Sequence, residues 1–210
     1  MTLDEIAAQL RRPNGDLGRI VGENMNVSNR LLTERAFARL HVAPGDRVLE
    51  IGPGNGQLVP ALFAAQPDFA YVGLDYSALM VEEANRHLAG PQVQFVLGEA
   101  EAMPFPDAGF DHVFTANTLY FWEEPLRTLA EIGRVLRPGG GLVIAIRSAA
   151  TMRALPFTQY GFRLYEAADV VSLLTSAGYV ADPPESWAES TTFQERVIPL
   201  QSVLVYARKA

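Results

Sequence analysis

Short apolar runs, each with the length of a buried strand, alternate with amphipathic stretches along the middle of the chain. We predict strands over residues 47–51, 70–74, 92–97, 110–115 and 141–146. The stretches between several of these runs repeat their apolar residues at helical spacing, and we predict helices over residues 57–65, 77–88 and 123–137. Nearly continuous apolar strands that alternate with helices predict a doubly wound α/β fold, in which helices cover both faces of a parallel sheet.

Three segments lie outside this alternation. Residues 1–45 are helix-prone, and residues 148–165 carry several aromatic side chains without a clear period. A helix is predicted over about 170–177, and residues 202–207 form a further strand-like run. No stretch marks an internal boundary, so we predict a single domain over residues 1–210.

The composition narrows the chemistry that this domain can perform. The chain has 210 residues, no cysteine and a formal net charge of −7. Without cysteine it has no disulfide, thiol nucleophile or cysteine-ligated metal, and its widely spaced histidines (His41, His87 and His112) predict no metal site. The acidic balance disfavours a nucleic-acid partner. With no membrane-spanning run and no secretory signal, we expect a cytoplasmic protein whose chemistry comes from a bound cofactor.

The sharpest motif lies at residues 48–56. A predicted strand leads directly into Gly52, Gly54 and Gly56, and a predicted helix follows. Glycine permits positive φ angles and close approach of the backbone to a ligand, and the first turn of a helix offers free N–H groups. The motif therefore predicts a ligand at the carboxyl end of the first strand, with a tight turn that binds nothing as the alternative.

Two acids indicate which ligand this turn binds. The dinucleotide fingerprint places a glycine three positions after Gly54, where Gln57 stands instead. Glu50 precedes the first glycine by two positions, and a carboxylate there would attract an amino group and repel a pyrophosphate. Asp75 ends the second predicted strand, where an acid can bind ribose hydroxyls. S-adenosylmethionine fits these features better than NAD.

Several motifs, in order, resemble those of the class I S-adenosylmethionine-dependent methyltransferases, in particular the type 11-like small-molecule branch. They lie at residues 50–56, 73–80, 98–105 with 109–111, and 134–140. The resemblance implies a Rossmann-like, mostly parallel seven-stranded sheet with helices on both faces and an N-terminal helical lid. It divides the chain into a helical cap (1–45), a cofactor-binding core (46–147) and a substrate-side insert with C-terminal strands (148–210).

The resemblance also implies S-adenosylmethionine as the cofactor and assigns residues to its methionine end. Glu50 would lie near the methionine amino group, and Asn117 would contact the methionine portion through its backbone. The loop that would line this portion consists of Gly52, Pro53, Gly54, Asn55 and Gly56.

The same resemblance assigns the nucleoside end. Asp75 would bind the ribose hydroxyls, while Tyr76 and Met80 would flank the adenine. Glu99 would accept from the adenine amino group, and the N–H of Ala100 would cap the ring. The family most often has Asp at the position of Glu99, so this acid is a departure and could be a solvated loop residue. Asp75 could instead cap the helix that follows, and Met80 could belong to the core.

Methyl transfer requires mainly that the reactants are aligned and that water is excluded. Tyr120 and Trp122, after the fourth predicted strand, are the candidates for this catalytic positioning, because aromatic faces stabilise cations and stack on flat molecules. The alternative is that both rings only pack at the end of the strand. His112 is expected to be a packed or edge histidine, and none of the three histidines is predicted to be a general base.

The segments outside the alternation are expected to choose the acceptor. Residues 16–31 would pack over the cofactor as a lid, and residues 152–165 would form the opposite wall. An apolar, aromatic lining predicts a small organic acceptor as the partner, and the oligomeric state stays open. The alternatives are a non-catalytic cofactor-binding or regulatory module, a protein or RNA methyltransferase, and a nicotinamide oxidoreductase. The last is disfavoured by the glycine spacing and by the absence of a Tyr-x-x-x-Lys pair, since Lys209 is the only lysine.

Overall fold

The computed structural model describes residues 1–209, and its centre is one mixed sheet. The strands follow the order β3-β2-β1-β4-β5-β8-β6, and β7 pairs with β8. The first five of these strands are parallel, whereas β8 runs antiparallel to β5, β6 and β7. The strands are β1 (Asp46–Ile51), β2 (Phe69–Asp75), β3 (Val93–Leu97), β4 (Phe110–Ala116), β5 (Leu136–Arg147), β6 (Tyr179–Ala181), β7 (Glu185–Phe193) and β8 (Arg196–Lys209).

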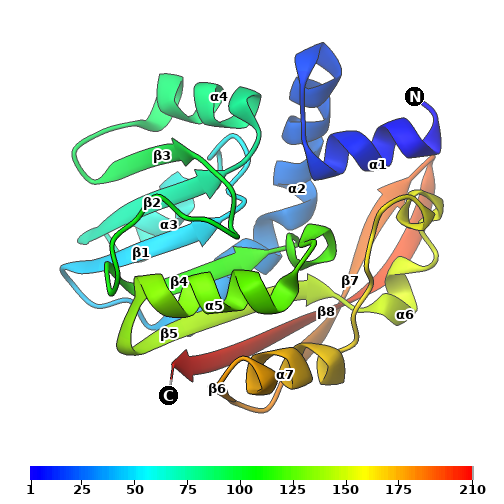
Figure 1. The fold of residues 1–210 in the computed structure, drawn as a ribbon. Helices are drawn as coiled ribbons and strands as arrows, with labels where there is room; N and C mark the ends of the chain where they lie inside the picture. Colours follow the sequence, from blue (N-terminus) through cyan, green and yellow to red (C-terminus); the bar gives the residue numbers. More distant parts are fainter. Residues whose placement is uncertain (210) are drawn as a thin grey trace.

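Helices cover both faces of the sheet (Figure 1). One face packs against α2, α3 and α4, and the other packs against α5 and α7. The helices are α1 (Leu3–Arg11), α2 (Gly15–Leu40), α3 (Val59–Ala65), α4 (Ala78–Leu88), α5 (Pro125–Val135), α6 (Ala149–Met152) and α7 (Ala167–Ser176), with short 3-10 turns η1 (Leu119–Phe121) and η2 (Pro156–Gln159). The doubly wound, Rossmann-like arrangement predicted from the sequence is confirmed.

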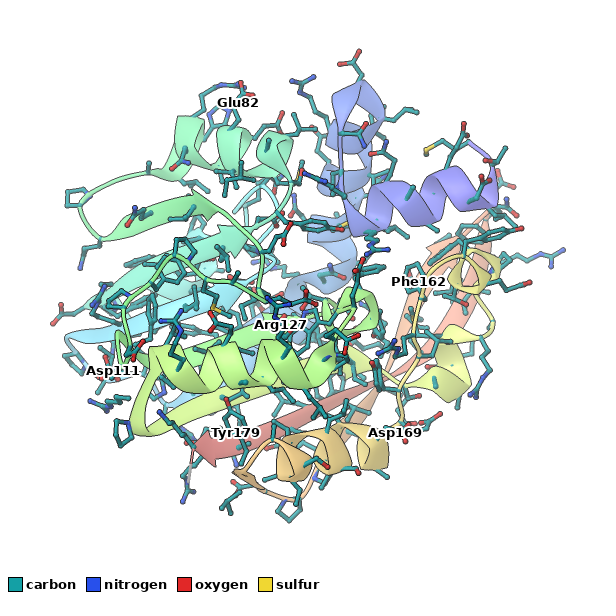
Figure 2. The ribbon with its side chains drawn as sticks, viewed as in Figure 1. Glu82, Asp111, Arg127, Phe162, Asp169 and Tyr179 are labelled. Atoms are coloured by element: carbon teal, nitrogen blue, oxygen red, sulfur yellow. The ribbon has the colours of Figure 1, made fainter. Side chains whose placement is uncertain are left out.

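The two cores follow from the alternation of side chains along each strand. In β1, Val48 packs into the core under α2, and Leu49 packs into the core under α5, because successive residues of a strand face opposite sides. Both side chains are fully buried. Within the second core, the hydroxyl of Tyr179, labelled in Figure 2, donates to the carbonyl of Leu129 at 2.8 Å and joins β6 to α5.

Several helix ends differ from the prediction, two of them beside prolines. The helix predicted to reach residue 137 ends at Val135, because a residue before proline is disfavoured in the helical conformation and Pro138 follows. Leu136 still packs in the same core, but as the first residue of β5. The helix predicted from Gln57 begins at Val59, where Pro60 suits the first turn.

The sheet has eight strands rather than the seven predicted, because the C-terminal segment forms a long hairpin. β7 pairs with β8 over nine residues, and the turn at Gln194 and Glu195 uses positive φ angles of 47° and 64°. Of this hairpin the sequence locates only residues 202–207, which lie in the mostly buried half of β8.

The helix-prone N-terminal segment forms α1 and α2 (Figure 1). α1 and the first half of α2 stand at the carboxyl ends of the parallel strands, whereas the second half of α2 packs on one face of the sheet. The turn between them is fixed to the core, since the hydroxyl of Ser77 donates to the carbonyl of Pro13 at 2.5 Å. Arg11 of α1 also forms an ion pair at 2.7 Å with Glu123, which lies just before α5. Within residues 1–209, no helix combines the length and the hydropathy that crossing a bilayer would require.

Candidate functional site

A large cavity lies where the parallel strands end, beneath α1 and α2. Its volume is about 1180 Å³. One part, which we call the glycine-loop end, is lined by Gly52, Gly54, Asp75, Tyr76 and Glu99. The other part, the aromatic end, is lined by Met152, Leu155, Phe157, Phe162, Phe193 and Leu200. Ligands of open α/β sheets bind at this edge, so the position of the cavity agrees with the fold.

The glycine loop requires its glycines for two different reasons. Gly52, Gly54 and Gly56 all have positive φ angles, of 77°, 60° and 74°. A Cβ on Gly52 would collide with the side chain of Thr118, and one on Gly56 would lie 2.7 Å from the ring of Phe95. A Cβ on Gly54 would meet only the sulfur of Met80, at 3.9 Å, so this position is open toward the cavity.

Asp75 lies against this open position. Its Oδ2 accepts from the backbone N–H of Gly54 at 3.0 Å, and its Oδ1 accepts from that of Ser77 at 2.8 Å. Burial raises the pKa of Asp75 to about 6, although the backbone hydrogen bonds act in the opposite direction. The N-cap of α4 is Ser77 rather than Asp75, because the Ser77 hydroxyl accepts from the N–H of Met80 at 3.3 Å. Asp75 therefore presents a buried carboxylate to the cavity.

Glu50 lies beneath the glycine loop and is not among the described residues that line the cavity. The hydroxyl of Tyr71 donates to Oε2 of Glu50 at 2.6 Å. Burial raises the pKa of Glu50 to about 7, and the nearby Asp75 charge acts in the same direction. Pro53, Asn55 and Gly56 also shape the loop from behind rather than line the cavity.

The residues expected around the adenine come together at the glycine-loop end. Tyr76, Met80, Glu99 and Ala100 all line the cavity. Met80 is fully buried, so it belongs to the core as well as to the cavity wall. Arg12 lies 5.2 Å from the centre of the Tyr76 ring, which joins the turn after α1 to this end of the cavity.

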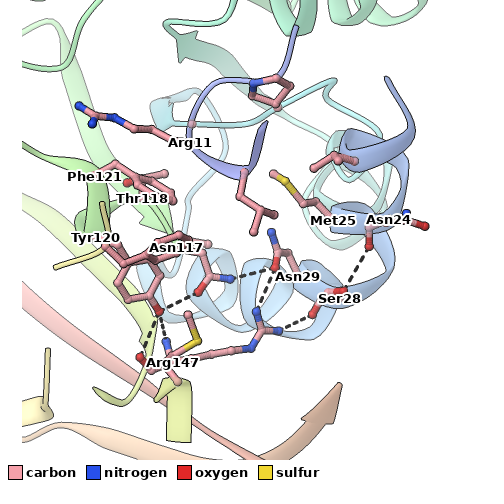
Figure 3. Close-up of a pocket in the computed structure, with 18 of the residues that line it drawn as sticks. Arg11, Asn24, Met25, Ser28, Asn29, Asn117, Thr118, Tyr120, Phe121 and Arg147 are labelled. Carbon is pink, nitrogen blue, oxygen red and sulfur yellow. Dashed lines mark hydrogen bonds between the residues drawn. The ribbon is translucent and has the colours of Figure 1, made fainter. Parts of the chain in front are cut away.

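Asn117 and Tyr120 line the cavity close to Asn29 and Arg147 (Figure 3). Asn117 has a positive φ of 58°, and its side-chain amide donates to Oδ1 of Asn29 at 2.9 Å. The Tyr120 hydroxyl accepts from the N–H of Arg147 at 2.5 Å and lies 3.1 Å from Oδ1 of Asn117. Burial raises the pKa of Tyr120 far above its usual range. Tyr120 and Trp122 are both buried, so the packing that formed the alternative for these rings is present, and their stacking role stays a prediction.

The histidines lie away from this chemistry. Nε2 of His112 is 3.0 Å from Oδ2 of Asp46, at the end of β1 opposite the glycine loop, and His87 is exposed on α4. Neither lines the cavity in the part of the chain that the structure describes. Among residues 1–209, no group of three His, Cys, Asp or Glu side chains could hold a metal ion.

Comparisons with known proteins agree on one family. Residues 49–144 match the family model described as a methyltransferase domain. A demethylmenaquinone methyltransferase of Renibacterium salmoninarum is 33% identical over 183 residues, which cover 80% of this chain and 75% of that protein. A demethylmenaquinone methyltransferase of Symbiobacterium thermophilum is 34% identical over 159 residues, and this chain spans only 62% of its length. The chain belongs to the class I S-adenosylmethionine-dependent methyltransferases.

A comparison with solved structures finds the same fold. A methyltransferase solved in complex with the Haloferax volcanii activator Trm112 superposes with a TM-score of 0.78, although the two sequences are only 23% identical. The match covers 98% of this chain and 96% of that chain. The structural similarity therefore includes the segments before residue 49 and after residue 144, which the family model does not match.

S-adenosylmethionine is the cofactor of this methyltransferase, and the glycine-loop end fits it. Gly54 leaves the backbone open toward the cavity, and the buried Asp75 carboxylate offers free lone pairs beside it. Glu50 and Asp75 also place two buried acids at the loop, which disfavours a pyrophosphate at the same position.

Two charged side chains of the cavity wall, Arg147 and Glu189, were not predicted from the sequence. Arg147, at the end of β5, donates through Nη1 to Oδ1 of Asn29 at 3.1 Å and through Nη2 to the carbonyl of Ser28. Glu189 of β7 lies 3.5 Å from Nη2 of Arg147. A cation that ends an apolar strand at the ligand-binding edge was a signal that could have identified Arg147. Glu189 had no such signal, because its strand is polar along most of its length.

Proposed function

We propose that this methyltransferase transfers a methyl group to a small organic acceptor that binds at the aromatic end of the cavity. The observation that carries the proposal is that one cavity of about 1180 Å³ contains both the glycine loop and the aromatic wall. Sites for a single small ligand measure roughly 300–1,000 Å³. The cavity is therefore large enough for a cofactor and an acceptor side by side.

The roles of the cofactor-binding residues form part of this proposal. The positions of Asp75, Tyr76 and Glu99 along the glycine-loop end support binding of the ribose and adenine by these side chains, with Met80 and Ala100 beside the ring. For the methionine end, the openness of Gly54 and the proximity of Gly52 to Thr118 support a binding loop. Glu50 and Asn117 would complete this end from below the loop and from β4.

The proposed catalysis relies on alignment rather than on an acid or base. When bound, S-adenosylmethionine supplies a methyl group on a sulfonium, which departs as a neutral thioether. In this proposal the residues of this chain position the acceptor and exclude water, and Asn117, Tyr120 and Trp122, which line the cavity, contribute to both. The hydrogen bonds of the Tyr120 hydroxyl fix its ring against β5.

A small acceptor is favoured over a macromolecule for two reasons. The relatives that match over most of this chain are named for demethylmenaquinone, a small molecule. The formal net charge of −7 disfavours nucleic acid as a substrate. In this proposal, residues 1–45 cap the cavity, 46–147 bind the cofactor, and 148–210 supply most of the aromatic end.

Calorimetric titration with S-adenosylhomocysteine and with NAD tests the cofactor part of the proposal. We expect binding of the first and at least about a hundredfold weaker binding of the second, because the acids at the loop repel a diphosphate. A panel of small aromatic and aliphatic acceptors, incubated with cofactor labelled in its methyl group, then tests transfer. Comparable binding of NAD, or no binding of S-adenosylhomocysteine, would overturn the proposal.

A further inference from the structure

A buried carboxylate lies in the cavity wall and is not one of the residues assigned to the cofactor. It belongs to Glu189 in the middle of β7, and its side chain is only 9% exposed. Burying an ionised carboxylate is costly unless it is paired and hydrogen-bonded. Its surroundings therefore indicate what it is placed to bind.

The two oxygens of Glu189 have different partners. Oε1 accepts from Nε1 of Trp187 at 2.6 Å. Oε2 is 3.5 Å from Nη2 of Arg147, and it accepts no hydrogen bond from any residue in the described range 1–209. The same guanidinium donates its hydrogen bonds to Oδ1 of Asn29 and to the carbonyl of Ser28 (Figure 3). Arg147 thus balances the charge of the carboxylate, but Oε2 has no hydrogen-bond donor.

The charges of this pair discriminate between acceptor types. At Oε2 an anionic acceptor would face the Glu189 carboxylate directly, and a cationic acceptor would lose part of its attraction to Glu189 through repulsion by Arg147, whose charge is only 3.5 Å away. A neutral hydroxyl can donate to Oε2 without either cost. The neighbouring wall is apolar, with Phe157, Phe162 and Phe193 placed to contact a hydrocarbon or aromatic body.

We propose that the acceptor of this methyltransferase is a neutral molecule with a hydroxyl group, which donates a hydrogen bond to Oε2 of Glu189 while its apolar body packs on the aromatic end. The inference rests on the proposed function, since it names the substrate class of the same cavity. Glu189 is a specificity-determining residue in this proposal. The simpler alternative is that Glu189 only balances the charge of Arg147 and never contacts the acceptor.

Calorimetry with four matched probes separates these two roles. The protein is first saturated with S-adenosylhomocysteine and then titrated with β-naphthol, β-naphthyl methyl ether, β-naphthoate or β-naphthylmethylamine. A hydrogen bond to a charged group predicts that naphthol binds at least about tenfold more tightly than the other three. Equal binding of naphthol and its ether, or no binding of any probe, overturns the proposal.

Two variants complete the test. Glu189→Gln keeps the shape but leaves the charge of Arg147 unbalanced, so we expect the preference for naphthol over naphthoate to fall by about tenfold or more. Glu195→Gln makes the same change at the exposed turn after β7 and should keep the wild-type preference. An unchanged preference in Glu189→Gln overturns the proposal.

The cofactor titration keeps this test separate from that of the proposed function. Glu189→Gln should bind S-adenosylhomocysteine as the wild-type protein does, which shows that the variant is folded. If the variant fails to bind it, the wild-type ranking of naphthol against its ether and naphthoate decides the proposal. If the wild-type protein itself does not bind S-adenosylhomocysteine, the proposed function fails instead.

Discussion

The hydroxyl of Tyr71 on β2 donates a 2.6 Å hydrogen bond to Oε2 of Glu50 on β1, directly beneath the glycine loop. Both side chains are buried, with exposures of 1% and 5%. The acid of the glycine motif is therefore held by a neighbouring strand. This pair connects the stability of the sheet to the shape of the cofactor site.

Removing the Tyr71 hydroxyl should destabilise the fold. In Tyr71→Phe, the buried carboxylate loses its hydrogen-bond donor, so we expect the free energy of unfolding to fall by about 1–3 kcal/mol. Urea denaturation measures this change. Tyr160→Phe is the control, since Tyr160 is 47% exposed and should cost little. Equal stability of the two variants would contradict the role of the pair.

Glu50 should make the stability depend on pH. Burial raises its pKa to about 7 from the usual 4.5, so between these values the folded state holds more protons than the unfolded state. The free energy of unfolding should therefore fall as the pH rises through this window. Asp75 has a pKa of about 6, so above this pH the decline comes mainly from Glu50. In Glu50→Gln the free energy of unfolding should therefore change little as the pH rises above about 6. Urea denaturation across the window tests this, and an unchanged slope would refute it.

Asp75 should contribute directly to cofactor affinity. Asp75→Ala removes the carboxylate that faces the cavity, so the affinity for S-adenosylhomocysteine should fall by roughly tenfold to a hundredfold. Asp107→Ala, at an acid whose side chain is 80% exposed, is the matched control. Calorimetry measures both variants. If Asp75→Ala retained the wild-type affinity, Asp75 would have no part in binding.

Two glycines with the same φ angle should respond differently to alanine. Gly52 and Gly139 have φ angles of 77° and 75°, but only a Cβ on Gly52 meets another side chain, that of Thr118. Gly139→Ala should cost about 1 kcal/mol from backbone strain alone, and Gly52→Ala should cost roughly 1–3 kcal/mol more. Urea denaturation of the two variants gives the difference, which would be near zero if Thr118 could move aside.

His112 should be dispensable for the reaction. Its ring contacts Asp46 at 3.0 Å, away from the cavity, so His112→Ala should leave the affinity for S-adenosylhomocysteine and the rate of methyl transfer unchanged. A loss of stability of about 1 kcal/mol is expected from the broken contact. Loss of methyl transfer with cofactor binding intact would show that His112 participates in catalysis.

Much of the fold could be predicted from short stretches of sequence. Four of the five parallel strands were predicted within one residue of their observed ends, because buried strands require continuous apolar runs. The fifth, β5, was predicted only over its apolar part and begins five residues earlier, at Leu136. The glycine loop was found for a similar reason, since positive φ angles favour glycine wherever they occur. Helix ends were less accurate, as Pro138 and Pro60 moved two of them by two residues.

The β7–β8 hairpin could not be predicted in this way. Along β7, exposed residues alternate with half-buried ones, and polar side chains such as Ser186, Glu189 and Thr191 replace the apolar pattern of a core strand. Its conformation depends on nine residues of pairing with β8. Since these contacts involve a partner strand, no local pattern in the sequence predicts β7 or an eighth strand in the sheet.

The sequence by itself determined the alternation of strands and helices, the glycine turn and the acid that ends β2, because each depends on residues close together in the chain. Only the tertiary structure decided which side chains became neighbours. Tyr71 meets Glu50 because β1 and β2 are adjacent, and Arg147 meets Glu189 because β8 brings β7 to β5. Such pairs depend on the order of strands in the sheet, which is set by the packing of the whole chain.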